Sequence, residues 1–165
     1  HYYHPNVAEL QGHNAAIYKT VWFNNREVSN TATSGGFLNI DTNNQASYVD
    51  ATEYYYVLVD LKLLHTISGV DFQSPTSGQY PIHVRVSSSY DSSLGERAFI
   101  NWPLCDSLEL SVSSLTEYSF TCSSVMLGRY LVLTKSADLG FFRVDQIFVF
   151  AEECKLELNL KVFFA

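Results

Sequence analysis

The chain has 165 residues, of which 47% are hydrophobic, 15% aromatic and 16% charged, and its formal net charge is −7. This composition predicts one folded domain, because disordered chains are poor in aromatic residues and rich in charge. The acidic balance, with no run of Lys or Arg, argues against nucleic acid as a partner and against binding to anionic membranes.

The two ends of the sequence are set apart from the predicted domain. Residues 1–5, His-Tyr-Tyr-His-Pro, lack an initiator Met and the apolar region of a signal peptide, so we expect a processed or excised chain with a flexible start. No segment approaches the roughly 20 apolar residues that span a bilayer. Residues 152–165 alternate in polarity, which predicts an extra edge strand or the start of a following segment.

Short runs rich in Val, Ile, Tyr and Phe predict strands along most of the chain, and clusters of Ser, Gly, Asn, Asp and Pro separate them. This spacing is typical of an antiparallel sandwich or barrel. We expect helix to be limited to a turn or two, and residues 87–97 to form a Ser-rich surface loop. The predicted strands are 55–61, 67–72, 82–86, 99–102, 129–133 and 144–150.

Two of these strands differ in pattern. Residues 54–61 are almost continuously apolar, as expected of a central strand covered on both faces. Residues 82–86 alternate, so their apolar side chains are expected to point inward, with His83 and Arg85 together on the other face.

The three cysteines are Cys105, Cys122 and Cys154. Cys105 and Cys122 flank two short strand-like runs, 108–112 and 118–120, and we predict that they form a disulfide, which implies an oxidising compartment. Two buried free thiols in an intracellular protein are the alternative. Cys154 is left free, bonded to another chain or paired with a segment outside this sequence.

Several stretches, read in order over residues 6–151, resemble the discoidin superfamily, which includes the F-type lectins and coagulation-factor C domains. They are Asn6-Val7-Ala8, Asn39-Ile40-Asp41-Thr42-Asn43, Val59-Asp60-Leu61, Thr66-Ile67-Ser68-Gly69-Val70, Phe120-Thr121-Cys122, Gly128-Arg129-Tyr130-Leu131 and the closing Asp145 to Ala151. The resemblance implies an all-β fold: an eight-stranded antiparallel jelly-roll β-sandwich, like a galactose-binding domain, with ligand loops at one end.

The resemblance also indicates where a ligand would bind. Fucose-binding members grip the sugar with a His and two Arg residues, but the first Arg position falls near Pro75 here and the His is absent. The loop 73–81 occupies the corresponding place and offers amide groups and an aromatic face. The predicted ligand-binding residues are Gln73, Gln79, Tyr80, His83 and Arg85, and the alternative is an ordinary solvated face.

Family members often hold a structural Ca²⁺ in the turn that corresponds to residues 38–43. Hard cations take six to eight oxygen ligands, and the equivalent groups here are Asp41, the carbonyls of Leu38 and Asn43, and Gln146 or Asp145. A metal-free turn stabilised by its Asx side chains is the alternative.

Trp22 and Phe23 correspond to the apolar spike with which coagulation-factor C domains enter lipid, but an aromatic pair of this kind belongs more often to a core. The sequence holds no Gly-x-Ser-x-Gly, His-Glu-x-x-His or phosphate-binding Gly-rich motif. We therefore expect a protein that binds and does not catalyse.

The leading hypothesis is a secreted, lectin-like recognition and adhesion domain that binds a glycan or glycoprotein through loops at one end of the sandwich. The alternative is a structural or adhesion subunit that assembles with copies of itself or other chains and has lost sugar binding. The missing His and Arg residues favour this alternative.

Overall fold

The computed structural model describes residues 14–17, 19–28, 37–41, 54–109, 116–137 and 142–154, with the backbone alone for 37–41. Within these ranges all strand pairs are antiparallel, so the predicted all-β fold is confirmed. The strands are β1 (Thr20–Phe23), β2 (Arg26–Glu27), β3 (Phe37–Asp41), β4 (Tyr54–Gln73), β5 (Ile82–Ser87), β6 (Leu104–Leu108), β7 (Glu117–Ser136) and β8 (Arg143–Glu153), and a 3₁₀ segment, η2, covers Ser92–Asn101.

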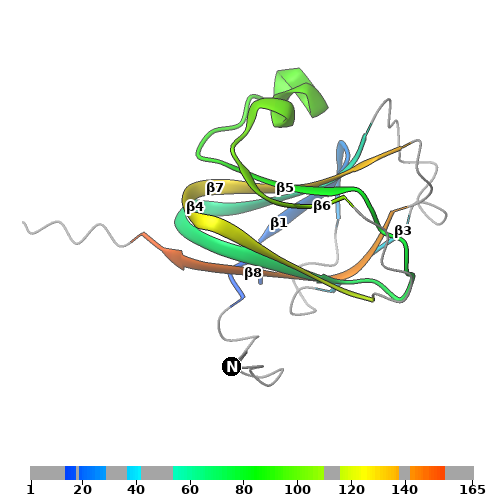
Figure 1. Cartoon of the computed structure of the whole chain (residues 1–165). Helices are drawn as coiled ribbons and strands as arrows, with labels where there is room; N and C mark the ends of the chain where they lie inside the picture. Colours follow the sequence, from blue (N-terminus) through cyan, green and yellow to red (C-terminus); the bar gives the residue numbers. More distant parts are fainter. Residues whose placement is uncertain are drawn as a thin grey trace, which may run out of the picture.

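The strands form two layers, and the long strands β4 and β7 run through both of them (Figure 1). The first layer has the order β2-β1-β4-β7-β5-β6 and uses residues 54–60 of β4 with 130–136 of β7. The second layer has the order β3-β8-β4-β7 and uses residues 65–73 of β4 with 117–128 of β7. The sequence pattern predicts two separate strands where β4 lies and two where β7 lies. In the structure, β4 and β7 are each one continuous strand of 20 residues.

The bend of β4 is fixed by the carboxylate of Asp60. Lys62 has a left-handed backbone, with a φ of 71°, and its N–H donates to Asp60 Oδ1 at 2.8 Å. Arg129 of β7 donates to both carboxylate oxygens, at 2.8 and 3.0 Å. Burial alone would raise the pKa of Asp60, but the hydrogen bonds from Arg129 and Lys62 outweigh burial and lower it.

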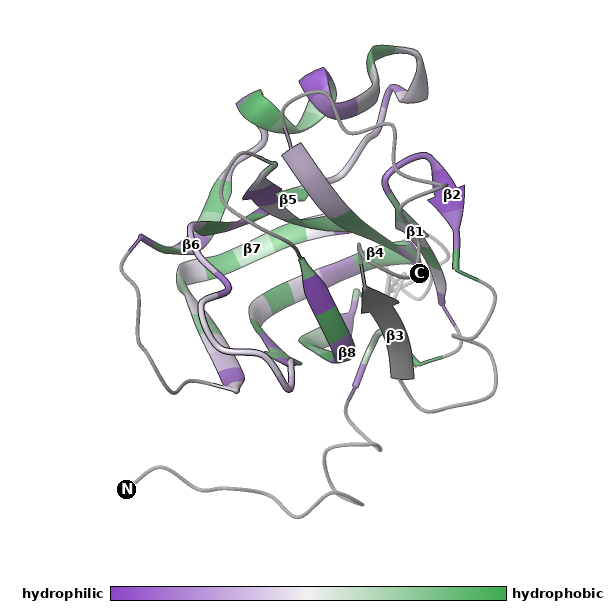
Figure 2. Ribbon diagram, turned by 90° about the vertical axis from the view of Figure 1, so that its right-hand side faces the viewer, coloured by the Kyte–Doolittle hydropathy of each residue, from purple (hydrophilic) through white to green (hydrophobic). Residues whose placement is uncertain are grey.

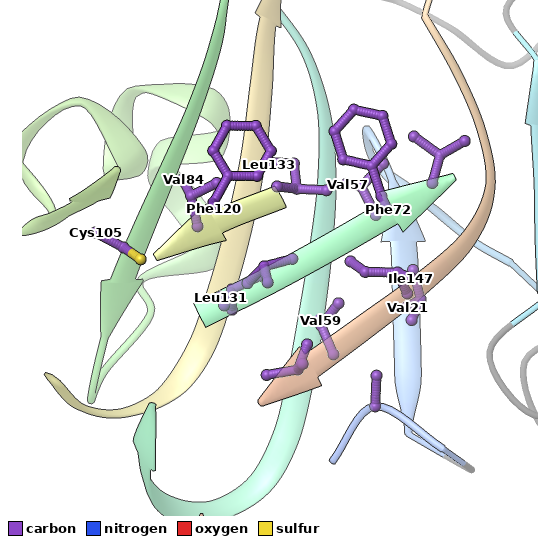
Figure 3. Packing of buried hydrophobic residues seen from close by; sticks show 14 of the residues in the cluster. Val21, Val57, Val59, Phe72, Val84, Cys105, Phe120, Leu131, Leu133 and Ile147 are labelled. Carbon is purple, nitrogen blue, oxygen red and sulfur yellow. The ribbon is translucent and has the colours of Figure 1, made fainter. Parts of the chain in front are cut away.

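The main core lies between the two layers (Figure 3). Val57 and Val59 point into it from the first layer, and Phe72 points into it from the second. Phe72 stacks on Tyr118 with ring centroids 4.5 Å apart. Close approach of the strands also requires glycine at position 69, because a Cβ there would lie 2.5 Å from the backbone oxygen of Phe120.

The outer face of the first layer carries a second apolar cluster, which η2 covers. This explains why residues 54–61 are apolar on both faces, as predicted. Val57 and Val59 face the main core, while Tyr56 and Leu58 face the second cluster. The alternation predicted for 82–86 is confirmed as well, because buried and half-buried residues alternate along β5.

The segment η2 corrects two predictions. Residues 92–97 are 3₁₀ rather than loop, and Phe99 lies in this segment rather than in a strand over 99–102. Asp91 caps the first turn, since its side chain accepts from the N–H of Ser93 at 3.0 Å. Gly95, with a φ of 58°, kinks the segment. Phe99 is drawn into helix by its contacts with the cluster, because tertiary packing overrides a local strand preference.

The predicted disulfide is present and joins Cys105 of β6 to Cys122 of β7. Cys105 lies inside β6 rather than ahead of a strand at 108–112, and residues 110–112 are outside the described ranges. Cys154, just after β8, forms no disulfide within the described part of the chain. The predicted start over 1–5 and the tail from 155 onward also lie outside it.

Trp22 and Phe23 divide between the two apolar clusters. Phe23 is buried in the main core, and Trp22 is half-buried against the second cluster. The core interpretation therefore holds for Phe23. Among the described residues, no helix is long and apolar enough to cross a membrane.

Candidate functional site

The alternation of β5 places His83 and Arg85 side by side on the outer face of the first layer, as predicted. In register they lie opposite Thr134 and Val132 of β7. Between this face and η2 is a pocket of about 250 Å³. It is lined by Tyr54, His83, Arg85, Glu96, Phe99, Ile100 and Thr134.

Hydrogen bonds hold the two basic side chains of the pocket in place. Arg85 donates from one terminal nitrogen to the carbonyl of Trp102 at 3.0 Å. The guanidinium has five N–H groups in a planar fork, so this bond orients the group while using one donor. His83 Nε2 lies 2.8 Å from Oε1 of the exposed Glu109, and this contact restrains the imidazole.

The rest of the lining supplies an acceptor and apolar walls. Glu96 accepts from the backbone N–H of Tyr54 at 3.3 Å through Oε2. Phe99 is buried, whereas Ile100 is 51% exposed and forms an apolar rim. Oriented donors and an acceptor over apolar walls are the chemistry that a small, neutral, hydroxyl-bearing ligand requires.

The other predicted ligand residues lie outside this pocket. Gln73 ends β4 in the second layer, opposite Glu117 of β7 and Gln146 of β8. Tyr80 lies over the buried side chain of Lys135, whose Nζ is 5.9 Å from the ring centroid. Of the five predicted ligand-binding residues, His83 and Arg85 are therefore the two that line this pocket.

Gln79 requires a correction, because its side chain is only 2% exposed. Its Oε1 accepts from the backbone N–H of Arg143 at 2.9 Å, and its own N–H donates to the hydroxyl of Tyr118 at 3.1 Å. Gln79 thus ties the loop after β4 to β7 and β8, and it does not face solvent where a ligand could reach it.

Lys135 lies beneath this loop and is 1% exposed. Its Nζ donates to the carbonyl of Gly78 at 3.3 Å. Burial lowers the pKa of Lys135, because the ammonium group loses hydration without gaining a carboxylate partner among the described residues.

The predicted calcium ligands are described only in part. Leu38 and Asp41 lie in β3, whose side chains are outside the described set, as is all of Asn43. Asp41 pairs with Arg143, and Phe37 pairs with Gln146. The described residues contain no group of three or more His, Cys, Asp or Glu side chains placed to hold a metal. Calcium at residues 38–43 stays a prediction.

Five of the seven lining residues were not predicted from the sequence: Tyr54, Glu96, Phe99, Ile100 and Thr134. They come from β4, β7 and η2. Tyr54 and Thr134 could have been found by extending the face of β5 across neighbouring strands. Glu96 and Phe99 carry no such signal, because the sequence pattern predicts a loop over residues 87–97 and a strand over residues 99–102.

The fold itself belongs to a known class. Its antiparallel β-sandwich is shared with solved structures of carbohydrate-binding proteins, so the sandwich fold implied by the sequence resemblance is confirmed. No model of a protein family matches the sequence, and a comparison with curated proteins finds no match either.

Three solved structures illustrate this similarity of fold. An F-type lectin (fucolectin) from the serum of the striped bass, Morone saxatilis, matches 86% of this chain with a TM-score of 0.60 and 15% identity. This chain spans 48% of that lectin chain. The module CpGH89CBM32-6 of Clostridium perfringens matches 84% of this chain and 99% of its own, with a TM-score of 0.56 and 16% identity. The third, chitosan-binding module 1 of a Paenibacillus chitosanase/glucanase, matches 83% of this chain and 98% of its own, with a TM-score of 0.52 and 13% identity.

Proposed function

We propose that this domain is a secreted carbohydrate-binding module that takes a neutral sugar of a glycan or glycoprotein into the pocket beside η2. The observation that carries the proposal is the pairing of Arg85 and His83, both oriented by hydrogen bonds, above apolar walls. The fold is shared with a lectin and with carbohydrate-binding modules, which supports the same function. The proposal includes no catalytic step.

In this arrangement Arg85 and His83 orient the ligand. Arg85 donates charge-assisted hydrogen bonds to sugar hydroxyls, Glu96 accepts a hydroxyl hydrogen, and Ile100 covers an apolar face of the ring. A pocket of about 250 Å³ holds little more than one sugar unit. We expect affinities between micromolar and millimolar for one site, and tighter binding through several copies on a surface.

A glycan array probed with the chain, with and without calcium, tests the proposal. Arg85→Ala should weaken binding about tenfold or more, because a charged donor is lost. Arg85→Lys should recover part of the loss, since it keeps the charge without the planar fork. The matched control is Gln73→Ala, which lies outside the pocket and should bind like the wild-type chain. Equal loss in the control, or an unchanged Arg85→Ala, would contradict the assignment.

The alternative of an assembly subunit is favoured by one feature. The bends of β4 and β7 expose four apolar side chains at one end of the sandwich: Leu63 (54%), Leu64 (42%), Val125 (66%) and Leu127 (57%). Cys154 lies beside them, and its N–H donates to the carbonyl of Leu64 at 2.9 Å. A blank array together with a discrete oligomer in solution, dispersed by Leu64→Ser or by Cys154→Ser, would select this function.

A further inference from the structure

A second pocket lies on the same outer face of the first layer, on the other side of η2. Its volume is about 420 Å³. Gly95 and Ser92 of η2 border it, whereas Glu96 and Phe99 of the same segment border the pocket of the proposed function. The complete lining is Trp22, Asn24, Asn25, Tyr56, Leu58, Asp60, Tyr90, Ser92, Gly95 and Tyr130.

Four aromatic side chains, Trp22, Tyr56, Tyr90 and Tyr130, line this second pocket. Their positions are set before any ligand arrives. Tyr90 packs on Tyr130 with centroids 5.7 Å apart and stacks on Phe99 at 5.6 Å. The guanidinium of Arg129 lies 4.9 Å from the Tyr130 ring centroid. Rings held by their neighbours lose little entropy when a flat apolar surface packs against them.

The polar groups in the lining include an amide with spare donors. Asn24 is 4% exposed, and its Oδ1 accepts from the backbone N–H of Tyr56 at 2.9 Å. Its side-chain nitrogen donates to none of the described residues. Within the described part of the chain, the amide is therefore fixed by its oxygen and keeps two N–H donors for a partner. Asn25, next to it in the turn between β1 and β2, is exposed.

The lining of this pocket carries one charged side chain, and that side chain is paired. Asp60 is its one ionised lining residue, and Arg129 and Lys62 hold both carboxylate oxygens, at 2.8 to 3.3 Å. Burial raises the pKa of Tyr56 and Tyr90, so their hydroxyls are neutral under all physiological conditions. None of the lining side chains therefore offers an unpaired charge to an ionic ligand, which favours a neutral ligand rich in hydroxyl groups.

We propose that this second pocket binds the pyranose ring of a neutral saccharide, with the apolar face of the ring on Trp22 or Tyr130 and its hydroxyls on Asn24 and Asn25. The domain then has two saccharide sites, one on each side of η2. Tyr54 and Tyr56 mark the two sites on one face of β4, two residues apart, which is about 7 Å along a strand. This inference goes beyond the proposed function, and neither depends on the other.

The test uses the ¹⁵N-labelled chain and titration with methyl glycosides of glucose, galactose, fucose and N-acetylglucosamine. The two tryptophans give separate indole signals, and Trp102 borders neither pocket. We expect a saturating shift of the Trp22 indole and the Asn24 side-chain amide for at least one glycoside. The same shifts should remain in Arg85→Ala, which affects only the first pocket.

Two variants confirm the position of the second site. Trp22→Ala should weaken the Asn24 shift about tenfold, because it removes a stacking surface. Since Trp22 also packs against the apolar cluster, Asn25→Ala serves as a variant with no buried contact to lose, and it should weaken the same titration several-fold. Both are compared with the wild-type chain for thermal unfolding.

The outcomes separate the two sites. If glycosides shift only the Arg85 side-chain signal and leave Trp22 unmoved, the second site is wrong and the proposed function stands. If they shift Trp22 alone, the second site stands and the first is wrong. Shifts of Trp22 with a polyproline decamer but with no glycoside would make the pocket a peptide site and overturn the inference. No shift with any probe overturns both sites.

Discussion

The two layers of the sandwich share one core but turn different surfaces outward. The outer face of the first layer carries Trp22, Tyr56 and Tyr130. The segment η2 lies over this layer (Figure 2). The outer face of the second layer carries short hydroxyl side chains, such as Ser68 of β4 and Ser119 of β7, which are exposed. The inner faces do not show this contrast, because both must pack against each other.

The difference between the two outer faces indicates which of them is suited to bind a saccharide. Aromatic side chains hold η2 against the first layer and leave a pocket on each side of it. A pocket of about 410 Å³ also lies on the second layer, but Phe150 is the one aromatic residue among its described lining residues. The first layer offers four aromatic side chains in one pocket and oriented donors in the other, so we place both sites there.

Phe99 holds η2 on the outer face of the first layer. Replacing it should remove the difference between the outer faces of the two layers, with the largest loss of stability among the variants proposed here. Phe99 is 2% exposed and packs on Tyr56 and Trp102 at 4.7 and 5.0 Å. Phe99→Ala should lower the free energy of unfolding by about 4 kcal/mol and release η2 from both pockets. Urea unfolding and amide exchange measure the two effects. Leu94→Ala, at an exposed position of η2, is the control and should change stability by less than about 0.5 kcal/mol.

Removing the disulfide measures how much the crosslink between the two layers contributes to the free energy of unfolding. The disulfide links β6 of the first layer to the second-layer half of β7 and closes a loop with a sequence separation of 17 residues. Replacing Cys105 and Cys122 by Ser should lower the free energy of unfolding by about 3 kcal/mol in the chain-entropy model. Cys154→Ser is the matched control. A double variant as stable as that control would show that the crosslink contributes nothing.

A smaller effect is expected at the bend between the layers. Asp60→Asn should lower the free energy of unfolding by about 2 kcal/mol at neutral pH, because it removes charge-assisted hydrogen bonds from Arg129. The pKa of Asp60 is lower in the folded chain than in the unfolded chain, where it is about 4. Its stabilisation is therefore present above about pH 4 and is lost as the pH falls below that value.

Unfolding by urea across this pH range gives the measurement for Asp60. The difference between the wild-type chain and Asp60→Asn should shrink at acidic pH. Arg129→Met should cost less in the Asp60→Asn background than in the wild-type chain, because the two residues are directly coupled. A difference that stays constant with pH, or additive effects of the two substitutions, would contradict the proposed role.

The sequence predicts the strands best where each residue keeps the same neighbours along the whole strand, so that one hydrophobic pattern describes all of it. The alternation of 82–86 and the continuous apolar run of 54–61 correspond to β5 and to the double-sided half of β4. The continuity of β4 was missed, because Lys62 and the exposed Leu63 and Leu64 interrupt the pattern at the bend. Local periodicity records which side is buried, and burial changes side where a strand passes from one layer to the other.

The candidate sites were less predictable than the strands. His83 and Arg85 could be paired, because they lie two residues apart on one strand. Glu96 and Phe99 reach the same pocket from η2, and Asn24 reaches the second pocket from a turn. These contacts depend on the path of the chain in space. The run Tyr54-Tyr55-Tyr56 and the pair Trp22-Phe23 are local signals of aromatic surface, but they do not show which aromatic side chains meet.

Because β4 and β7 pass through both layers, they also determine how the domain unfolds. Two layers that are held together by side-chain packing alone could separate without breaking backbone hydrogen bonds. Here, any movement that parts the layers must break backbone hydrogen bonds of the β4–β7 ladder at its bends. We therefore expect amide protons of both layers to exchange through one shared global opening, so that neither layer can act as a hinged lid over the other.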